Sequence, residues 1–483
     1  MFFLRNRIAT GFRSYATKPS SYGQPLFKSH PHLIKSNELT PGIPAEEYED
    51  RRRRLMEKLP ENSLVVSLAG SIKYMSGLIF YNFRQASDFW YLTGFEEPNS
   101  AVILEKNHSS RGYRMTLFSL GSDSSKEQWD GASTTFADAR KLFRVDDARH
   151  IDDFSSHLRS IVPQYSNIYL DLPPSRQGRT SKATTKSLLK YLTGPSEADL
   201  ILDSLGKSRP KPLAPEVRCL RAIKSDSEQK LMRAAADISG RAHAKTMRFT
   251  RPGLSEAALA AHFNYLCSLS GAQRLAYVPV VASGPNALII HYTHNNQLVS
   301  EDELILMDAG CEYNGYASDI TRTYPANGTF TAPQRDLYAA VLSAQKALVA
   351  LCHEGSDLTF HDLHRKSCDL LRQELIQLGF QLQSGDLERL YPHFISHPIG
   401  IDLHEDGYSR TGTLKEGMVV TVEPGIYVPP SPAFPKHYHN LGIRIEDEVL
   451  VGKEHPVVLS VNAPKEIADV EGACQGVLGL EPF

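Results

Sequence analysis

The sequence predicts a mixed α/β protein built from two domains. Its 483 residues exceed what one ordinary hydrophobic core organises. In the first part of the chain, short apolar runs alternate with polar helical stretches, as in an α/β domain. A stretch rich in Lys and Pro at 207–215 then precedes a part that mixes long helical patterns with clear strands. We therefore expect a smaller α/β domain at 41–206, a linker at 207–216 and a second, α/β or α+β domain at 217–483.

The first domain begins with a predicted helix at residues 45–59, where Glu and Asp come early and Arg and Lys come late. That order suits the helix dipole. Within it, the RRRR run at 51–54 is predicted to be a solvated face. Four short apolar runs bounded by Gly, Ser, Asn or Asp are predicted to be strands. They are SLVVSLAG (63–70), AVILEK (101–106), YRMTLFSLG (113–121) and NIYLDL (167–172).

The second domain begins with a strongly helical pattern at 215–251, which has a Ser/Asp start and dense helix formers. Another helix is predicted at 334–351. Three apolar runs are predicted to be strands, and each of them offers one acid to a shared interior. They are ELILMDAG (303–310), MVVTVEPGIYV (418–428) and GIRIEDEVLV (442–451).

Composition and charge exclude several classes of protein. The hydrophobic fraction of 41% and charged fraction of 22% are typical of a globular chain. Six basic residues precede the first acid, Glu38, which leaves 47 basic against 55 acidic residues in the rest. A nucleic-acid partner is therefore not expected, because phosphate binding needs a basic surface. The sequence contains no run of about 18 apolar residues, so no membrane span is predicted. Its six cysteines are scattered and form no C-x-x-C pair, which indicates neither disulfides nor a thiolate zinc site.

Residues 1–40 are expected to be a mitochondrial targeting segment and extension. The first 23 residues are rich in Arg and Ser and lack acids, and Leu4, Ile8 and Phe12 are spaced for one helical face. Arg5 and Arg7 interrupt any apolar core of a secretory signal. The expected location is the mitochondrial matrix, with association to the inner membrane as an alternative, and the expected mature start is near Ala16. A disordered basic tail remains the other interpretation.

The Asn314-Gly315 pair predicts a two-residue hairpin that brings two acids together. If the turn is centred there, Asp308 lies opposite Thr321. Counting along the hairpin then places Asp308 and Asp319 on the same face as diagonal neighbours, about 7–8 Å apart at the backbone. Two carboxylates converging from such positions can hold metal ions about 3.5–4 Å apart.

Three further residues complete a predicted metal site. Glu423 ends an apolar strand before a Pro-Gly turn, and Glu446 shares a strand face with Arg444. His397 lies in the apolar FISHPIG segment. Taken singly, each acid is more often a turn or salt-bridged residue, and such a histidine is more often a core residue. Together with Asp308 and Asp319 they form an oxygen-rich set that favours hard or borderline divalent ions such as Mn²⁺.

At these residues the chain resembles the Xaa-Pro aminopeptidase branch of the M24 family, which includes methionine aminopeptidases, prolidase and creatinase. The resemblance rests on MDAGCEYNGYASDITRTYP, SHPIGIDLHE, VEPGIY and IRIEDEVL, and on FRQASDFWYLTGFEEP in the first part. It implies a pita-bread (creatinase/aminopeptidase) catalytic domain preceded by a smaller creatinase-type α/β domain. It also implies that two divalent ions, with Mn²⁺ favoured, are bound by Asp308, Asp319, His397, Glu423 and Glu446.

The same resemblance implies roles for the ligands and for residues around them. Asp319 and Glu446 would bridge the ions, Asp308 would bind one ion, and His397 and Glu423 the other. Glu423, His291 and His404 are the expected catalytic residues, Glu423 as a proton shuttle and the histidines as contacts to the substrate. Tyr277, Arg410 and Arg444 match supporting positions, and Arg444 is expected to orient Glu446 or Glu423.

The expected function is that of a two-metal aminopeptidase, since two such ions make water a nucleophile near neutral pH. Its substrate would be the amino terminus of a peptide or of an imported mitochondrial protein, from which it removes one residue. An Xaa-Pro aminopeptidase or prolidase that requires proline is the alternative. A metal-free binding module and a creatinase-like hydrolase are disfavoured because all five ligand positions are filled. A homodimer is left open.

Overall fold

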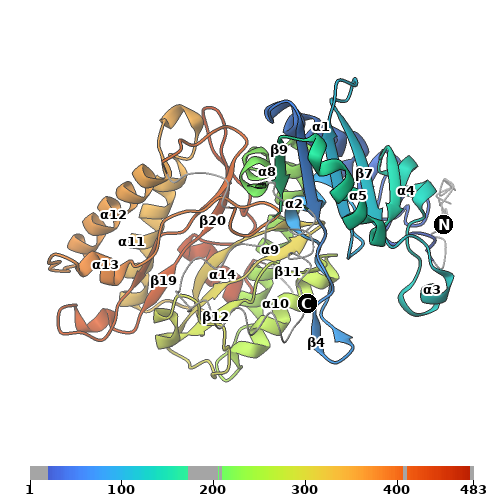
Figure 1. Ribbon diagram of the computed structural model, residues 1–483. Helices are drawn as coiled ribbons and strands as arrows, with labels where there is room; N and C mark the ends of the chain where they lie inside the picture. The colour runs from blue at the N-terminus through green and yellow to red at the C-terminus, as the bar shows by residue number, and fades with distance from the viewer. Residues whose placement is uncertain (1–19, 172–204, 206–208, 406–410, 479–483) are drawn as a thin grey trace, which may run out of the picture. The chain divides into compact units, whose positions relative to one another are not determined.

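The structure, a computed structural model, describes residues 20–171, 205, 209–405 and 411–478 (Figure 1). The chain divides into two compact units, Met1–Leu220 and Arg221–Phe483. Within the described residues, no helix is long and apolar enough to cross a bilayer. Of the targeting segment and extension predicted at 1–40, residues 1–19 lie outside the described residues.

The first unit is built on a six-stranded mixed sheet with the strand order β10-β9-β3-β6-β7-β8. All four predicted strands are confirmed as members of this sheet. Strand β3 pairs with β6 in antiparallel and with β9 in parallel fashion. The strands of the unit are β1 (Glu38–Thr40), β2 (Ile43–Pro44), β3 (Ser63–Leu68), β4 (Tyr74–Ser76), β5 (Ile79–Phe80), β6 (Ala101–Lys106), β7 (Tyr113–Ser119), β8 (Asp147–His150), β9 (Asn167–Leu170) and β10 (Lys211–Pro212).

Helices accompany this sheet, and apolar residues on α5 pack against residues of β3, β6 and β9 to form its core. The predicted first helix is confirmed as α1 (Ala45–Lys58). The others are α2 (Ser87–Thr93), α3 (Ser124–Asp130), α4 (Phe136–Leu142) and α5 (Phe154–Ile161). The predicted linker, 207–216, contributes the short exposed strand β10 and the start of α8 (Ala214–Arg221).

The prediction that the RRRR run is a solvated face is wrong for its first two residues. Arg51 and Arg52 are buried. Arg51 pairs with Glu47 and stacks on the Tyr91 ring, with 4.3 Å from guanidinium carbon to ring centroid. Arg52 donates to the Tyr113 hydroxyl at 2.9 Å. A buried guanidinium is tolerated where its donors are satisfied, and aromatic faces supply part of that compensation.

The second unit holds its strands between two groups of helices (Figure 1). Its strands form sheets with the orders β12-β13-β16, β11-β14-β15, β17-β20-β21 and β18-β19. They are β11 (Arg274–Leu275), β12 (Val280–Ser283), β13 (Leu304–Asp308), β14 (Cys311–Tyr313), β15 (Tyr316–Ala317), β16 (Thr321–Pro325), β17 (Val419–Val422), β18 (Gly425–Tyr427), β19 (Gly442–Arg444), β20 (Asp447–Leu450) and β21 (Val457–Val458).

One group of helices contains α9 (Asp226–Phe249), α10 (Glu256–Leu269) and α14 (Ile467–Gln475), and the other contains α11 (Ala332–Val349), α12 (Phe360–Gln377) and α13 (Asp386–Leu390). The helical pattern predicted at 215–251 corresponds to two helices, α8 and α9. Ser225 separates them because its hydroxyl and the Glu228 side chain form a capping box at the start of α9. The large apolar core of the unit joins these helices to β13, β16 and β19.

Candidate metal centre

The predicted hairpin is present with the predicted register. Tyr313 pairs with Tyr316 and Asp308 with Thr321. Asn314 and Gly315 both have positive φ, 49° and 86°, as a type I′ turn requires. Asp308 therefore ends β13 and Asp319 lies just before β16, with both carboxylates directed to a common site.

The other three predicted ligands reach this site from separate segments. Glu423 follows β17, and Glu446 connects β19 to β20. His397 lies in an extended segment that pairs with β17, where the Thr421 amide donates to the His397 carbonyl at 2.9 Å. The Thr421 hydroxyl in turn accepts from the His397 amide and donates to Glu423 Oε1 at 3.2 Å. One threonine thus links two predicted ligands.

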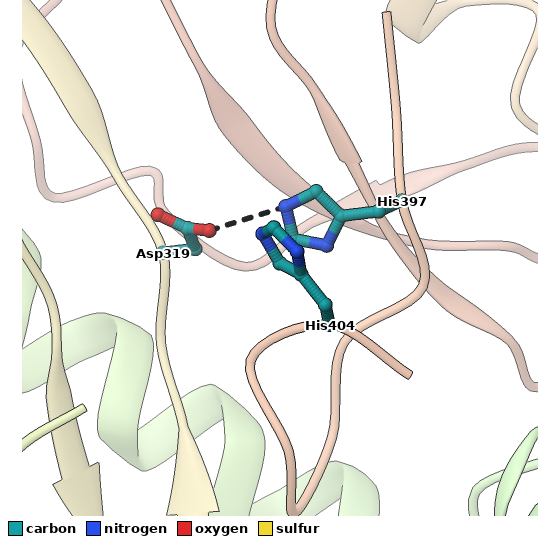
Figure 2. A group of neighbouring side chains, drawn as sticks. All are labelled: Asp319, His397 and His404. Carbon is teal, nitrogen blue, oxygen red and sulfur yellow. Dashed lines mark ion pairs between the residues drawn. The ribbon is translucent and has the colours of Figure 1, made fainter. Parts of the chain in front are cut away.

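Ligand atoms of the five residues lie close enough to share ions. Asp308, Asp319 and Glu446 each offer an oxygen within 4.8 Å of the others, and so do the ligand atoms of His397, Glu423 and Glu446. His404 joins Asp319 and His397 in a third such group. Figure 2 shows this group, with Asp319 Oδ2 3.3 Å from His397 Nε2 and the two imidazole rings 4.1 Å apart between centroids.

The donor set fits divalent cations. Within the described residues, Glu446 Oε1 is buried and has no hydrogen-bond partner. Burying a carboxylate oxygen without a partner costs folding free energy unless a cation binds to that oxygen. Four carboxylates and one imidazole in one pocket suit ions with hard or borderline character and disfavour a thiolate site.

The pKa values of the cluster show how strongly these acids are crowded. Burial raises the pKa of Glu423 to about 7, although His397 and Arg444 oppose the shift. Burial and the charges of Asp319 and Glu423 raise the pKa of Glu446 well above its usual value. Burial lowers the pKa of His397, but the hydrogen bond to Asp319 and the charge of Glu423 outweigh it and raise the pKa to about 9. The four carboxyl groups outnumber the positive charges in this pocket, so added positive charge would stabilise their ionised forms.

Tyr277 and Arg444 contact the two hairpin acids. The Tyr277 hydroxyl lies 2.5 Å from Asp308 Oδ1 and 2.6 Å from Asp319 Oδ1. Arg444 donates from Nη2 to Asp308 Oδ2 at 2.6 Å. Arg444 was expected to orient Glu446 or Glu423, so its direct partner differs from the expectation. Its link to Glu446 is indirect, because Arg444 Nε donates to the Thr321 hydroxyl, which donates to Glu446 Oε2 at 2.6 Å.

The cluster lines a pocket of about 470 Å³, and His291 and His404 line the same pocket. Both histidines are exposed to solvent. Arg410 lies outside the described residues. His393 was not predicted and also lines the pocket, with its Nε2 2.9 Å from the Tyr427 hydroxyl and its Nδ1 3.9 Å from Glu423 Oε2. Its position four residues before His397 in the same apolar segment was the available signal.

Glu448 is a second residue that the sequence did not single out. It is fully buried on β20, and its Oε1 accepts a hydrogen bond from the Asp319 amide at 2.6 Å. Burial raises its pKa well above the usual value, and the hydrogen bond from Asp319 opposes the shift only in part. The Glu448 side chain therefore fixes the backbone from which Asp319 enters the pocket.

Comparison with known families assigns both parts of the chain. Residues 48–169 match the N-terminal domain of aminopeptidase P. Residues 230–453 match metallopeptidase family M24. All five clustered residues fall inside the second match.

Individual relatives resemble the chain over nearly its whole length. Intermediate cleaving peptidase 55 of Saccharomyces cerevisiae is 40% identical, covering 99% of this chain and 93% of the relative. Xaa-Pro aminopeptidase 3 of Rattus norvegicus is 36% identical, covering 94% and 91%. A crystal structure of the S. cerevisiae protein, Icp55, covers 91% of this chain and 100% of that chain at 36% identity with a TM-score of 0.80. Aminopeptidase P from E. coli gives the same TM-score at 29% identity, with 91% and 100% covered.

Proposed function

Because this chain belongs to metallopeptidase family M24, as a metallo-aminopeptidase of the Xaa-Pro aminopeptidase branch with a pita-bread catalytic domain, we propose that it removes a single amino-terminal residue from proteins imported into mitochondria. The observation that carries this proposal is the convergence of Asp308, Asp319, His397, Glu423 and Glu446 in one pocket. The likeness to an intermediate cleaving peptidase over 99% of the chain supports the choice of substrate.

These five residues would hold two divalent ions, for which we propose Mn²⁺. In this proposal Asp319 and Glu446 would contribute to holding both ions, Asp308 would help hold one of them, and His397 and Glu423 would help hold the other. Bound divalent ions lower the pKa of water and polarise the peptide carbonyl. The raised pKa values of Glu423 and Glu446 support this assignment, because cations would take the place of the protons that the metal-free pocket retains.

The surrounding side chains would bind and orient the substrate. Glu423, whose carboxylate lines the pocket, would pass a proton from water to the leaving amine. His291 and His404 line the pocket and can donate hydrogen bonds to the carbonyl oxygen as it gains negative charge. Asp308 can receive the free amino terminus. Tyr277 and Arg444 keep Asp308 in place for that contact.

An Xaa-Pro aminopeptidase activity is the second candidate. One relative that carries that name is 36% identical over 94% of the chain. A strict requirement for proline, including that of a prolidase limited to dipeptides, would need a pocket shaped for the proline ring.

Mass spectrometry of two matched peptide series separates the candidates. The chain from Ala16 onward, supplied with Mn²⁺, is incubated with peptides that begin Tyr-Ala and with peptides that begin Xaa-Pro. The proposal predicts that Tyr-Ala peptides lose tyrosine and no further residue. Release only from Xaa-Pro peptides would support the second candidate, and cleavage within the peptides would contradict both.

We also propose a mitochondrial location and a homodimer. One relative that is 34% identical over 97% of the chain is named as mitochondrial, and the first 23 residues have the composition of a targeting segment. The dimer is supported by the hairpin of β4 and β5, defined here as the apolar hairpin. Its Leu78 is 87% exposed and Phe80 is 59% exposed. Contiguous apolar surface of this kind is typical of a protein interface.

A further inference from the structure

The segment at 283–297 carries His291 and has little regular structure of its own. It leaves β12 at Ser283, forms the 3-10 helix η3 (Gly284–Leu288) and then runs without strand or α-helix past His291. Among the described residues, the His291 ring has no hydrogen-bond partner. Its position in the pocket is therefore determined by how the backbone of this segment is held.

A single buried carboxylate holds the segment. Glu256, the first residue of α10, has no exposed surface. Its two oxygens accept five hydrogen bonds, all of them from this segment. Oε1 accepts from the Ser283 amide at 2.9 Å, the Ser283 hydroxyl at 2.8 Å and Asn286 Nδ2 at 2.9 Å, and Oε2 accepts from the Tyr292 hydroxyl at 2.9 Å and the Gln297 amide at 3.0 Å.

The electrostatics favour the ionised form of Glu256. Burial alone would raise its pKa, but the hydrogen bonds from Ser283, Asn286 and Gln297 outweigh it and lower the pKa below the usual value. The carboxylate also lies at the amino-terminal end of α10, where the helix dipole stabilises negative charge. Hydrogen bonds to an ionised acceptor are stronger than those to a neutral one.

We propose that Glu256 is a positioning residue that sets the place of His291 in the substrate pocket. The bonds fall on both sides of His291, at Ser283 and Asn286 before it and at Tyr292 and Gln297 after it. The Tyr292 bond acts on the residue directly next to His291. This inference rests on the proposed role of His291 in binding substrate.

The variant Glu256→Gln tests the proposal with little change in shape. The glutamine side chain keeps one oxygen that can accept hydrogen bonds. Its NH₂ group replaces the other oxygen and faces partners that are themselves donors. We expect kcat for release of the amino-terminal residue to fall at least tenfold, because small displacements of a catalytic group are costly. Bound Mn²⁺ should stay unchanged, since none of the five proposed ligands contacts Glu256. Tyr292→Phe, which removes a single donor, should give a smaller loss of the same kind.

The double variant Glu256→Gln/His291→Ala distinguishes positioning from a general loss of structure. If Glu256 acts through His291, the double variant is no slower than His291→Ala alone, within about twofold. Losses that multiply would overturn the proposal, as would full activity of His291→Ala. The matched control is Glu471→Gln, which also replaces a carboxylate by an amide. The Glu471 carboxylate accepts hydrogen bonds from the Phe330 amide and from the Arg335 guanidinium. Glu471 does not line the pocket. This control variant should retain wild-type kcat.

Amide hydrogen exchange tests the anchor without any activity. In Glu256→Gln, exchange should become faster within 284–297 and stay unchanged at Asp319 and at 419–422. Unchanged exchange in 284–297 would overturn the inference even in an active enzyme. By contrast, a wild-type protein that releases no residue from any peptide would contradict the proposed function, and the exchange result would still decide whether Glu256 holds the segment.

Discussion

At the scale of single residues, Arg444 is the main positive charge among the clustered acids. Its side chain is buried, with 2% exposed. The guanidinium donates hydrogen bonds to the Asp308 carboxylate, the Thr321 hydroxyl and the Tyr427 hydroxyl. Asp308 is thus paired before any ion binds, while Glu446 Oε1 is left without a partner among the described residues. The pocket therefore has one neutralised acid and a remaining excess of negative charge that a cation can meet.

Replacing Glu423 by glutamine tests the residue proposed to carry the proton. The amide side chain keeps the shape of the carboxylate but can neither move a proton nor offer a charged oxygen. We expect kcat to fall by at least about 100-fold, within the range that loss of a general acid or base gives. The measurement is release of tyrosine from a Tyr-Ala peptide at saturating Mn²⁺, with Glu471→Gln as the control. Activity within twofold of wild type in Glu423→Gln would refute the assigned role.

The raised pKa values predict how pH affects the metal-free protein. Glu423, with a pKa of about 7 instead of 4.5, holds its proton more tightly when folded, so stability falls as pH rises from 4.5 through 7. His397, with a pKa of about 9 instead of 6.5, contributes stability that is present below pH 6.5 and is lost as pH rises through 9. Both groups act in the same direction.

Thermal midpoints of chelator-treated and Mn²⁺-loaded protein at pH 5, 7 and 9 measure this effect. Bound cations would compensate the charge that deprotonation creates, so the gap between the two midpoints should widen as pH rises. Titratable groups elsewhere in the chain affect both samples equally, so their contribution cancels in the difference between the two midpoints. A gap that stays constant or narrows from pH 5 to pH 9 would be inconsistent with these shifts.

At the scale of elements, the hairpin between Asp308 and Asp319 depends on a close backbone approach at Gly310. A Cβ added there would overlap the Ser318 carbonyl oxygen. The Ser318 hydroxyl also accepts a hydrogen bond from the Cys311 amide at 3.0 Å. The two strands therefore cannot separate without moving the acids that flank them.

Gly310→Ala should displace Asp308 relative to Asp319 and weaken metal binding at least tenfold, since ligand positions must be held closely. The measurement is Mn²⁺ binding by isothermal titration. Gly472→Ala is the matched control, because a Cβ there would make only ordinary contacts, with Leu478, on helix α14. Equal affinity in the two variants would show that the close approach at Gly310 does not matter for the site.

Local sequence signals were sufficient for much of this architecture. The Asn314-Gly315 pair determines the turn, and the period of two then places Asp308 and Asp319. What the sequence did not predict depends on tertiary contacts. Arg51 and Arg52 are buried because Tyr91 and Tyr113 reach them from distant elements. His393 faces the pocket through its contact with Tyr427, which lies 34 residues further along the chain.

At the scale of the whole molecule, the exposed apolar hairpin predicts self-association. Light scattering coupled to size-exclusion chromatography should give about twice the chain mass of 53.8 kDa. Leu78→Asp combined with Phe80→Asp should give a single-chain mass, because charge on both residues opposes burial of the hairpin. A wild-type protein that elutes as a monomer at micromolar concentration would contradict the proposed dimer.

The central claim is that one cluster of five side chains binds divalent ions and uses them to release one amino-terminal residue. The most direct measurement strips the protein with a chelator, returns Mn²⁺ stepwise, and follows bound metal and released tyrosine in the same samples. The account predicts no release without metal, and release that rises with occupancy up to two ions per chain. Full release from the stripped protein would contradict it.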